Sequence, residues 1–278
     1  MATFDNSGFK TRFVLEGDGP LVVLIHGVGA RLENWDRVAA LLANEYRVLR
    51  YDLRGHGEST RAPGPYSLPQ FADDLKALLG HVGEREVNVA GHSLGAMIAQ
   101  VFALRHATAV RRLALLSAVA GRTSEERARV AARIDLINTA DPGEHFRRSL
   151  PRWFSDAFIA ANPELIAAYA ARNASNDPDC YAAAYRVLAL DDLDRELEQI
   201  HVPTLVATGA LDVGSNPRMA ELIYSRIKGA TLRVLPGLKH SILIEAPHVV
   251  ASMLVAFFKG RTVPEVAQLM RSSKGNQP

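Results

Sequence analysis

The chain has 278 residues, 48% of them hydrophobic and 22% charged, with a formal net charge of +2. This composition is typical of a globular protein with a sizeable core, and the small net charge without a long basic run argues against nucleic acid as a partner. The only cysteine, Cys180, excludes an internal disulfide, which fits a reducing compartment.

The first half of the chain alternates strand-like and helix-like segments. Short β-branched runs predict strands at 20–27, 46–52, 86–91 and 110–118, and apolar residues at helical spacing predict helices at 34–45, 67–82 and 94–106. We expect Asn34 to cap the first helix, and Ser67 with Gln70 to form a capping box at the second. This alternation predicts βαβ units and a mostly parallel sheet with helices on both faces.

The alternation stops after Ala118. Between 121 and 199 there is no convincing strand, and helical fragments are predicted at 124–139, 162–174 and 179–192. The alternation then resumes, with strands at 202–212 and 230–237 and helices at 216–227 and 246–259. We therefore predict an α/β core at 1–120 and 200–260 with a helical cap inserted at 121–199. A polar, loosely held tail at 261–278 contains "VPEVAQLM", which could form a short helix.

A serine lies between two glycines where the strand at 86–91 becomes a helix. Gly91, Ser93 and Gly95 form the pattern Gly-x-Ser-x-Gly in a strand-turn-helix context, which is the nucleophile elbow. The glycines leave room for a sharp turn, and the helix directs its N–H groups and positive dipole end at the site. A coincidental turn of small residues is the alternative, and the flanking strand and helix argue against it.

A serine nucleophile needs a base, and the base needs an orienting carboxylate. After an elbow serine the expected chain order is acid and then histidine, at the carboxyl ends of strands. Asp212 and His240 follow strands in that order. Taken alone, Asp212 could be a helix cap and His240 a surface loop residue. The other position for the acid, after the strand that ends near Leu116, reads "SAVAG" and has no carboxylate.

Two backbone amides are predicted to form an oxyanion hole. One is the N–H of Leu94, directly after the serine, and the other is the N–H of Val28, in a loop where Gly27 and Gly29 let the backbone turn inward. Other polar residues near these loops are interpreted as scaffolding, with direct action on substrate as the alternative: His26, Asp52, Arg54, His56 and His92.

These motifs together resemble the α/β-hydrolase superfamily. The resemblance covers about Pro20 to Phe258 and rests on "HGVG" (26–29), "YDLRGHGES" (51–59), "GHSLG" (91–95), "GALD" (209–212) and "GLKHSI" (237–242). It implies an α/β-hydrolase fold, a mostly parallel sheet flanked by helices with a helical cap insertion. A closer similarity, to 3-oxoadipate enol-lactone hydrolases, rests on "VLRYDLRGHGEST", "GPYSLPQFADDLKALL", "LPRWFSDAF" and "PDCYAAAYRVLALDDL". Those lactonases often carry another pair where His26 and Gly27 stand.

The cap segment "RSLPRWFSDAF" brings two arginines close to a tryptophan. Arg148 and Arg152 could hold a substrate carboxylate with paired hydrogen bonds, and Trp153 could supply a flat apolar wall. The alternative is that Trp153 and Phe154 form the core of the cap while the arginines are solvated.

We therefore expect a serine hydrolase that acts on a small ester or lactone, plausibly one with a carboxylate. Ser93 would attack the carbonyl, His240 would take the proton, and Asp212 would stabilise the imidazolium, without a metal or organic cofactor. The same machinery suits C–C bond cleavage, amide hydrolysis or perhydrolysis, and a carboxylate nucleophile is disfavoured by Ser93. A protein of another class, which senses a small ligand and keeps the triad, stays open.

The remaining expectations concern partners and location. The N-terminus lacks the pattern of a signal peptide, and no apolar stretch is long enough to cross a bilayer. We expect a cytoplasmic monomer or homodimer whose partner is a small-molecule substrate, and neither nucleic acid nor a membrane.

Overall fold

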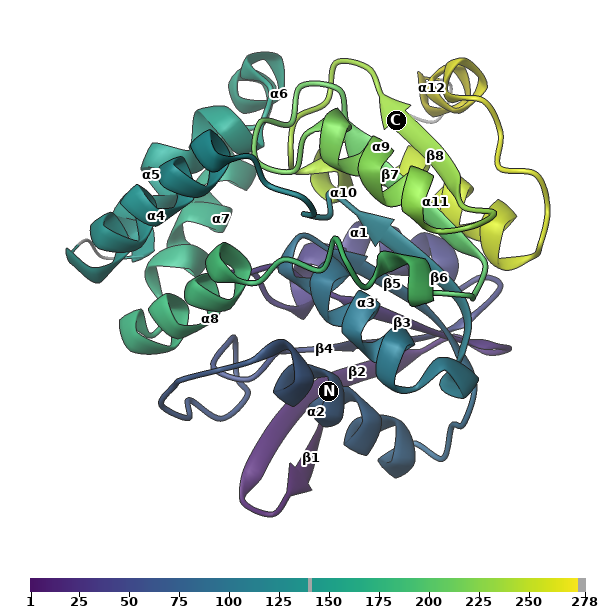
Figure 1. The fold of residues 1–278 in the computed structure, drawn as a ribbon, viewed down its shortest axis with the longest axis horizontal. Helices are drawn as coiled ribbons and strands as arrows, with labels where there is room; N and C mark the ends of the chain where they lie inside the picture. Colours follow the sequence, from purple (N-terminus) through teal and green to yellow (C-terminus); the bar gives the residue numbers. More distant parts are fainter. Residues whose placement is uncertain (140–141, 275–278) are drawn as a thin grey trace.

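The structure is a computed structural model, and it describes residues 1–139 and 142–274. Its strands form one sheet in the order β1-β2-β4-β3-β5-β6-β7-β8 (Figure 1). The pairs β1–β2 and β2–β4 are antiparallel, and all other neighbours are parallel. The strands are β1 (Ala2–Asn6), β2 (Phe9–Glu16), β3 (Leu21–Ile25), β4 (Arg47–Tyr51), β5 (Val87–His92), β6 (Val110–Leu116), β7 (Thr204–Gly209) and β8 (Thr231–Leu235).

Helices flank the sheet and form the insertion. The α-helices of the described residues are α1 (Asp36–Leu42), α2 (Leu68–His81), α3 (Leu94–Arg105), α4 (Ser124–Thr139), α5 (Pro142–Trp153), α6 (Asp156–Ala161), α7 (Pro163–Ala174), α8 (Pro178–Leu190), α9 (Pro217–Arg226), α10 (Ile242–Glu245), α11 (Pro247–Phe258) and α12 (Val266–Lys274). Short 3-10 turns are η1 (Leu32–Trp35), η2 (Ala107–Ala109) and η3 (Leu197–Gln199). No helix of the described residues is both long and apolar enough to span a bilayer.

The sheet is buried on both faces, which is why the central strand β3 is apolar throughout. Along β3, Leu21, Val23 and Ile25 pack into one core with α2, α3 and α9, while Val22 and Leu24 pack into another with α1 and α11. Side chains of a strand alternate between faces, so an uninterrupted apolar run needs helices on both sides. The predicted mostly parallel sheet with flanking helices and a helical insertion is confirmed.

Two capping predictions have different outcomes. The Ser67 hydroxyl accepts a hydrogen bond from the Gln70 N–H (3.3 Å) and caps α2, but the described residues show no return bond from the Gln70 side chain, so only half of the predicted capping box forms. The expected cap at Asn34 is wrong, because α1 begins only after Trp35. Asn34 lies in the 3-10 turn η1, and its side-chain oxygen accepts from the Arg31 N–H (3.2 Å).

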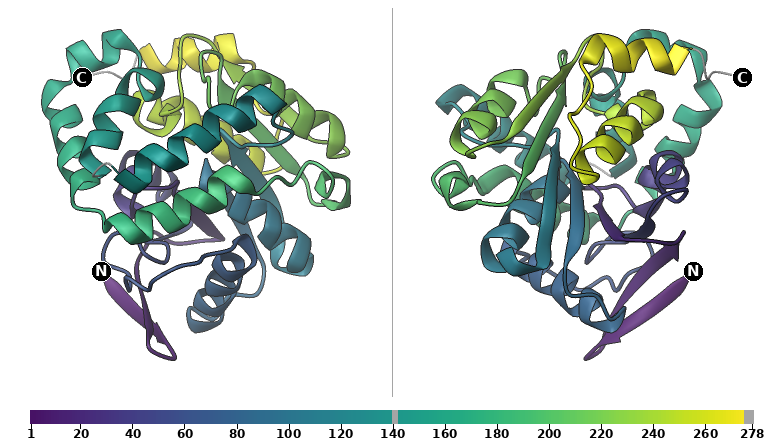
Figure 2. Two further views of the ribbon diagram at one scale, coloured as in Figure 1. Left: turned by 60° about the vertical axis from the view of Figure 1, so that its left-hand side comes forward. Right: turned by 90° about the vertical axis from the view of Figure 1, so that its right-hand side faces the viewer.

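The insertion consists of the five helices α4 to α8, which we call the cap; residues 140–141, within the predicted cap range, lie outside the described residues. The cap helices lie together at one end of the molecule, next to the loops that follow β5 and β7 (Figures 1 and 2). Sequence analysis predicted α4, α7 and α8 and missed α5 and α6. We propose that the domain boundaries of core and cap fall at 120 and 200.

The C-terminal tail is more ordered than expected. Val263 and Leu269 are buried in the same core as α11, and Val266 packs against that core from α12. Arg233 of β8 donates hydrogen bonds to the carbonyls of Pro264 (3.0 Å) and Val263 (2.5 Å). The expectation of a loosely held tail is therefore wrong for this part of it, because apolar residues three apart give the tail a face to bury. Residues 275–278 of the predicted tail lie outside the described residues.

Candidate active site

Ser93 lies at the turn between β5 and α3 with a backbone φ of 57°. A residue with a side chain rarely adopts this conformation, which costs about 1–3 kcal/mol and persists where the surroundings enforce it. Close packing enforces it here. A Cβ on Gly91 would lie 2.1 Å from the Gly95 carbonyl oxygen, and a Cβ on Gly95 would lie 2.3 Å from that of Ile25. A side chain at Gly91 or Gly95 would clash with the neighbouring backbone, so both positions require glycine.

Asp212 and His240 are joined by a hydrogen bond. His240 Nδ1 lies 2.7 Å from Asp212 Oδ2, and Asp212 Oδ1 accepts from the N–H groups of Gly214 (2.8 Å) and Ser215 (2.9 Å). Burial favours a raised pKa for Asp212, but the attraction of His240 and these hydrogen bonds outweigh it, so its pKa is lowered. Asp212 is therefore a buried, ionised carboxylate that fixes the orientation of the imidazole.

The two loops that carry Asp212 and His240 are held against each other. The Leu211 N–H donates to the Leu238 carbonyl (2.9 Å), and a Cβ on Gly209 would lie 2.2 Å from the Lys239 carbonyl oxygen. His92 Nε2 donates to the carbonyl of His240 (3.0 Å). Burial lowers the pKa of His92 to about 3, with repulsion from His240 adding to the shift, so the ring stays neutral at ordinary pH. This agrees with the scaffolding role predicted for His92.

The loops of the core and the inner side of the cap enclose one cavity. Ser93, Asp212 and His240 all line it, together with Val28. The cap contributes residues from four helices, including Arg133 of α4, Arg152 and Trp153 of α5, Tyr169 of α7 and Tyr185 of α8. The structure thus brings the three predicted catalytic residues, which are 28 to 147 positions apart in the chain, to the wall of one cavity.

The loop after β3 passes directly beside Ser93. A Cβ on Gly27 would lie 3.1 Å from Ser93 Cβ. In the described part of the chain, no acceptor is recorded for the N–H of Val28, which lies in this loop, or for that of Leu94, the first residue of α3. Two unused amides beside the serine suit an oxyanion hole. The roles of Val28 and Leu94 stay a prediction.

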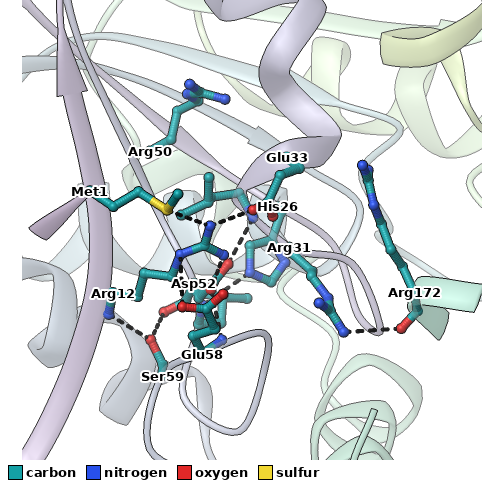
Figure 3. Close-up of polar contacts among 12 residues, drawn as sticks. Met1, Arg12, His26, Arg31, Glu33, Arg50, Asp52, Glu58, Ser59 and Arg172 are labelled. Carbon is teal, nitrogen blue, oxygen red and sulfur yellow. Dashed lines mark hydrogen bonds and ion pairs between the residues drawn. The ribbon is translucent and has the colours of Figure 1, made fainter. Parts of the chain in front are cut away.

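A buried polar network holds this loop in place (Figure 3). Asp52 accepts from the N–H groups of Leu32 (2.9 Å) and Glu58 (2.9 Å) and from the Arg12 guanidinium (3.1 Å). His26 Nε2 accepts from the Leu53 N–H (3.0 Å). Asp52 and His26 therefore connect the loops after β3 and β4, as the scaffolding interpretation predicts.

Arg54 and His56 also have structural partners. Arg54 forms a two-pronged ion pair with Asp74 of α2 (2.9 and 2.6 Å). His56 Nδ1 lies 2.9 Å from the Arg54 carbonyl oxygen. Both residues belong to the loop after β4: Arg54 ties this loop to α2, and His56 makes its contact within the loop.

The three cap residues predicted to bind substrate do not behave alike. Arg152 and Trp153 line the cavity. Arg148 is not among the residues that line it; its side chain is 58% exposed and forms an ion pair with Glu144, one helical turn away. The prediction that Arg148 binds substrate in this cavity is therefore wrong: Arg148 shares a helix face with Arg152 but lies one turn away along α5, where its side chain reaches solvent.

Sequence analysis missed further residues of the cavity wall, notably Arg133 and His145. Burial and then repulsion from Arg133 lower the pKa of Arg152. Burial and then the charges of Arg152 and Arg133 lower the pKa of His145 to about 4, so this histidine is neutral at ordinary pH. Among the residues that the structure describes, no carboxylate forms an ion pair with Arg152 or Arg133. Nothing in the sequence distinguishes Arg133 from the other arginines of α4.

Known proteins match the chain over most of its length. A model of the alpha/beta hydrolase fold family matches residues 20–247. 3-Oxoadipate enol-lactonase 2 of Acinetobacter baylyi is 27% identical over 246 residues, 87% of this chain and 91% of that protein. (E)-2-((N-methylformamido)methylene)succinate hydrolase of the same organism is 29% identical over 88% of this chain and 92% of that protein.

A solved structure agrees as well. The enol-lactonase of Burkholderia xenovorans LB400 matches with a TM-score of 0.87 at 28% identity, over 93% of this chain and 100% of that one. The fold, the elbow and the family match point the same way. The chain belongs to the alpha/beta hydrolase fold family.

Proposed function

We propose that this protein is a serine hydrolase that cleaves a small ester or lactone bearing a carboxylate. The observation that carries the proposal is the set of residues that line the cavity. Ser93 and the Asp212–His240 pair line one part of it, and the Arg152 and Arg133 guanidiniums, without a carboxylate partner in the described residues, line another. A buried cation without a counter-ion is unfavourable, so a bound anion is its natural partner.

The proposed reaction follows from this arrangement. Ser93 Oγ attacks the carbonyl carbon while His240 takes the hydroxyl proton, and the N–H groups of Val28 and Leu94 stabilise the oxyanion. The C–O bond of the ester or lactone then breaks, and His240 returns the proton to the leaving oxygen. Water, deprotonated by His240, attacks the acyl-serine; the bond to Ser93 Oγ breaks, the acid is released, and His240 returns the proton to Ser93 Oγ. Asp212 stabilises the imidazolium in both steps.

The names of the relatives support a carboxylate-bearing substrate. 3-Oxoadipate enol-lactonase and the succinate hydrolase of Acinetobacter baylyi are both named for compounds with carboxylate groups. In this protein, a substrate carboxylate held by Arg152 would position a distant carbonyl at Ser93, and binding energy of a remote group would assist the reaction.

The proposal is tested by replacing Arg152 with Gln and comparing two substrates. The measured quantity is kcat/KM for an anionic ester, such as a monoester of a dicarboxylic acid, and for a neutral ester of similar size. A hydrogen bond to a charged group contributes about 1.5–3 kcal/mol, so the anionic ester should lose at least about ten-fold in kcat/KM. The neutral ester should lose much less.

Two controls accompany this measurement. Arg147→Gln removes the same charge from the exposed face of α5 and should affect both substrates little. Ser93→Ala provides the inactive blank. Equal losses on both esters in Arg152→Gln would show that Arg152 supports the cap rather than the substrate. If the wild-type enzyme showed no preference for the anionic ester, the proposal that the substrate bears a carboxylate would be refuted.

A further inference from the structure

A second hollow lies entirely within the cap, between α4 and α5. The described residues that line it are Arg133, Leu136, His145, Arg148, Ser149 and Arg152. Arg133, His145 and Arg152 also line the cavity over Ser93. These three side chains therefore form a wall between the two hollows, and Arg148 and Ser149 belong to the second hollow alone.

The second hollow is strongly cationic. Among the side chains that the structure describes, three guanidiniums and no carboxylate line it. Glu144 pairs with Arg148 near the surface, where the Arg148 side chain is 58% exposed. Like charges held close together repel, and proteins compensate such clusters with an anion or with acidic side chains. Of these three arginines, only Arg148 has an acidic partner among the described residues.

A buried hydroxyl fixes the guanidinium in the wall. Ser149 is fully buried, and its Oγ accepts a hydrogen bond from Arg152 Nη2 (2.6 Å). The same oxygen lies 3.4 Å from His145 Nε2. His145 in turn contacts the rings of Trp153, Tyr181 and Tyr185. Because only one terminal nitrogen of Arg152 is used in this bond, the rest of its donors remain available to both hollows.

We propose that the second hollow is a carboxylate-binding pocket, in which Arg148 binds a second carboxylate while Arg152 and Arg133 bind the first. Its ligand class is a small dicarboxylate that extends past the wall, with one carboxylate on each side. This pocket adds a second carboxylate site to the proposed function. It rests on that function for the first carboxylate, which Arg152 and Arg133 bind. Arg148 would then contribute to ligand recognition, but in the second hollow and not in the cavity over Ser93.

The test measures binding in the Ser93→Ala protein, which cannot turn over an ester. Calorimetric titration compares adipate with hexanoate, which has the same chain length and one carboxylate. Adipate should bind at least about ten-fold more tightly, as expected for one more charge-assisted hydrogen bond. Arg148→Gln should remove this advantage, and Arg148→Lys should restore part of it. Arg147→Gln, the neighbouring exposed arginine of α5, should keep it in full.

The source of the second carboxylate is distinguished by stoichiometry. If a separate small acid occupies the pocket, two molecules of hexanoate bind per protein, and Arg148→Gln reduces this number to one. That result would support the pocket and identify a monocarboxylate as its ligand. If Arg148→Gln and Arg147→Gln bind both acids alike, the pocket is refuted. Binding is measured without turnover, so the two proposals can fail separately. Absence of hydrolysis in the wild type would overturn the proposed function, and the binding result would still test the pocket.

Discussion

The geometry of Asp212 makes it possible to predict how an amide would behave at that position. One carboxylate oxygen is held by two backbone N–H groups, of Gly214 and Ser215, and the other accepts from His240. An asparagine would keep its oxygen on the two N–H groups and turn its NH₂ group toward the histidine. A donor would then face Nδ1, which can no longer carry its hydrogen.

Asp212→Asn should therefore fold normally and hold His240 in the wrong tautomer. By analogy with the serine protease triad, kcat should fall about ten-thousand-fold. The measurement is steady-state hydrolysis of the ester found in the substrate comparison, with circular dichroism to verify the fold.

The matched control is the same exchange at Asp52, a buried carboxylate that contacts Arg12, Leu32 and Glu58 instead of His240. Asp52→Asn should mainly lower the free energy of unfolding, since loss of one partner of a buried ion pair costs roughly 3–5 kcal/mol. If Asp52→Asn abolished activity while Asp212→Asn were mild, Asp212 would not be the orienting acid.

At the level of elements, the corner between α5 and α6 attaches the cap to the loop that carries His240. The Ser241 N–H donates to the Trp153 carbonyl (2.9 Å), directly after His240. Ser155, which caps α6, donates from its N–H (3.1 Å) and its hydroxyl (2.6 Å) to the Glu245 carboxylate. The corner between α5 and α6 thus fixes the wall of the cavity relative to the predicted base.

Two capping serines allow this attachment to be tested. Ser155→Ala and Ser67→Ala each remove a hydroxyl that accepts an N–H at a helix start, and each should lower the free energy of unfolding by about 1 kcal/mol. Only Ser155→Ala should also raise KM, because it releases the cap from Glu245. Urea unfolding and ester kinetics measure the two effects, and unchanged kinetics in Ser155→Ala would mean that the corner does not position the cap.

At the level of the whole molecule, the tail closes the core beside α11. Val263 and Leu269 are buried, and burial of such a side chain contributes roughly 1.5–3 kcal/mol. Deletion of residues 261–278 should lower the free energy of unfolding by several kcal/mol, and the Arg233 guanidinium would lose the carbonyls of Val263 and Pro264 as partners. Thermal unfolding of the truncated protein tests this, and an unchanged midpoint would return the tail to the loosely held segment expected from sequence.

The N-terminal hairpin and α5 show why some elements were missed. In β2, the polar residues Thr11 and Arg12 are buried and Val14 lies between two apolar residues, so the strand lacks the regular alternation typical of one buried face. In α5, Pro151 interrupts the helical pattern, because proline normally disfavours a helix interior. Packing of the cap overrides that local preference.

The sequence by itself determined the six strands β3 to β8, the main helices that flank them and the positions of Ser93, Asp212 and His240. These depend on local signals: apolar runs that need burial on two faces, and motifs fixed to the ends of strands. Only the tertiary structure decided which arginines reach the cavity. Arg148 and Arg152 look equivalent in sequence and lie one helical turn apart on α5, yet only Arg152 reaches the cavity over Ser93, while Arg148 lines the second hollow only. Arg133 joins them from another helix, and such a meeting depends on packing between helices rather than on any local pattern.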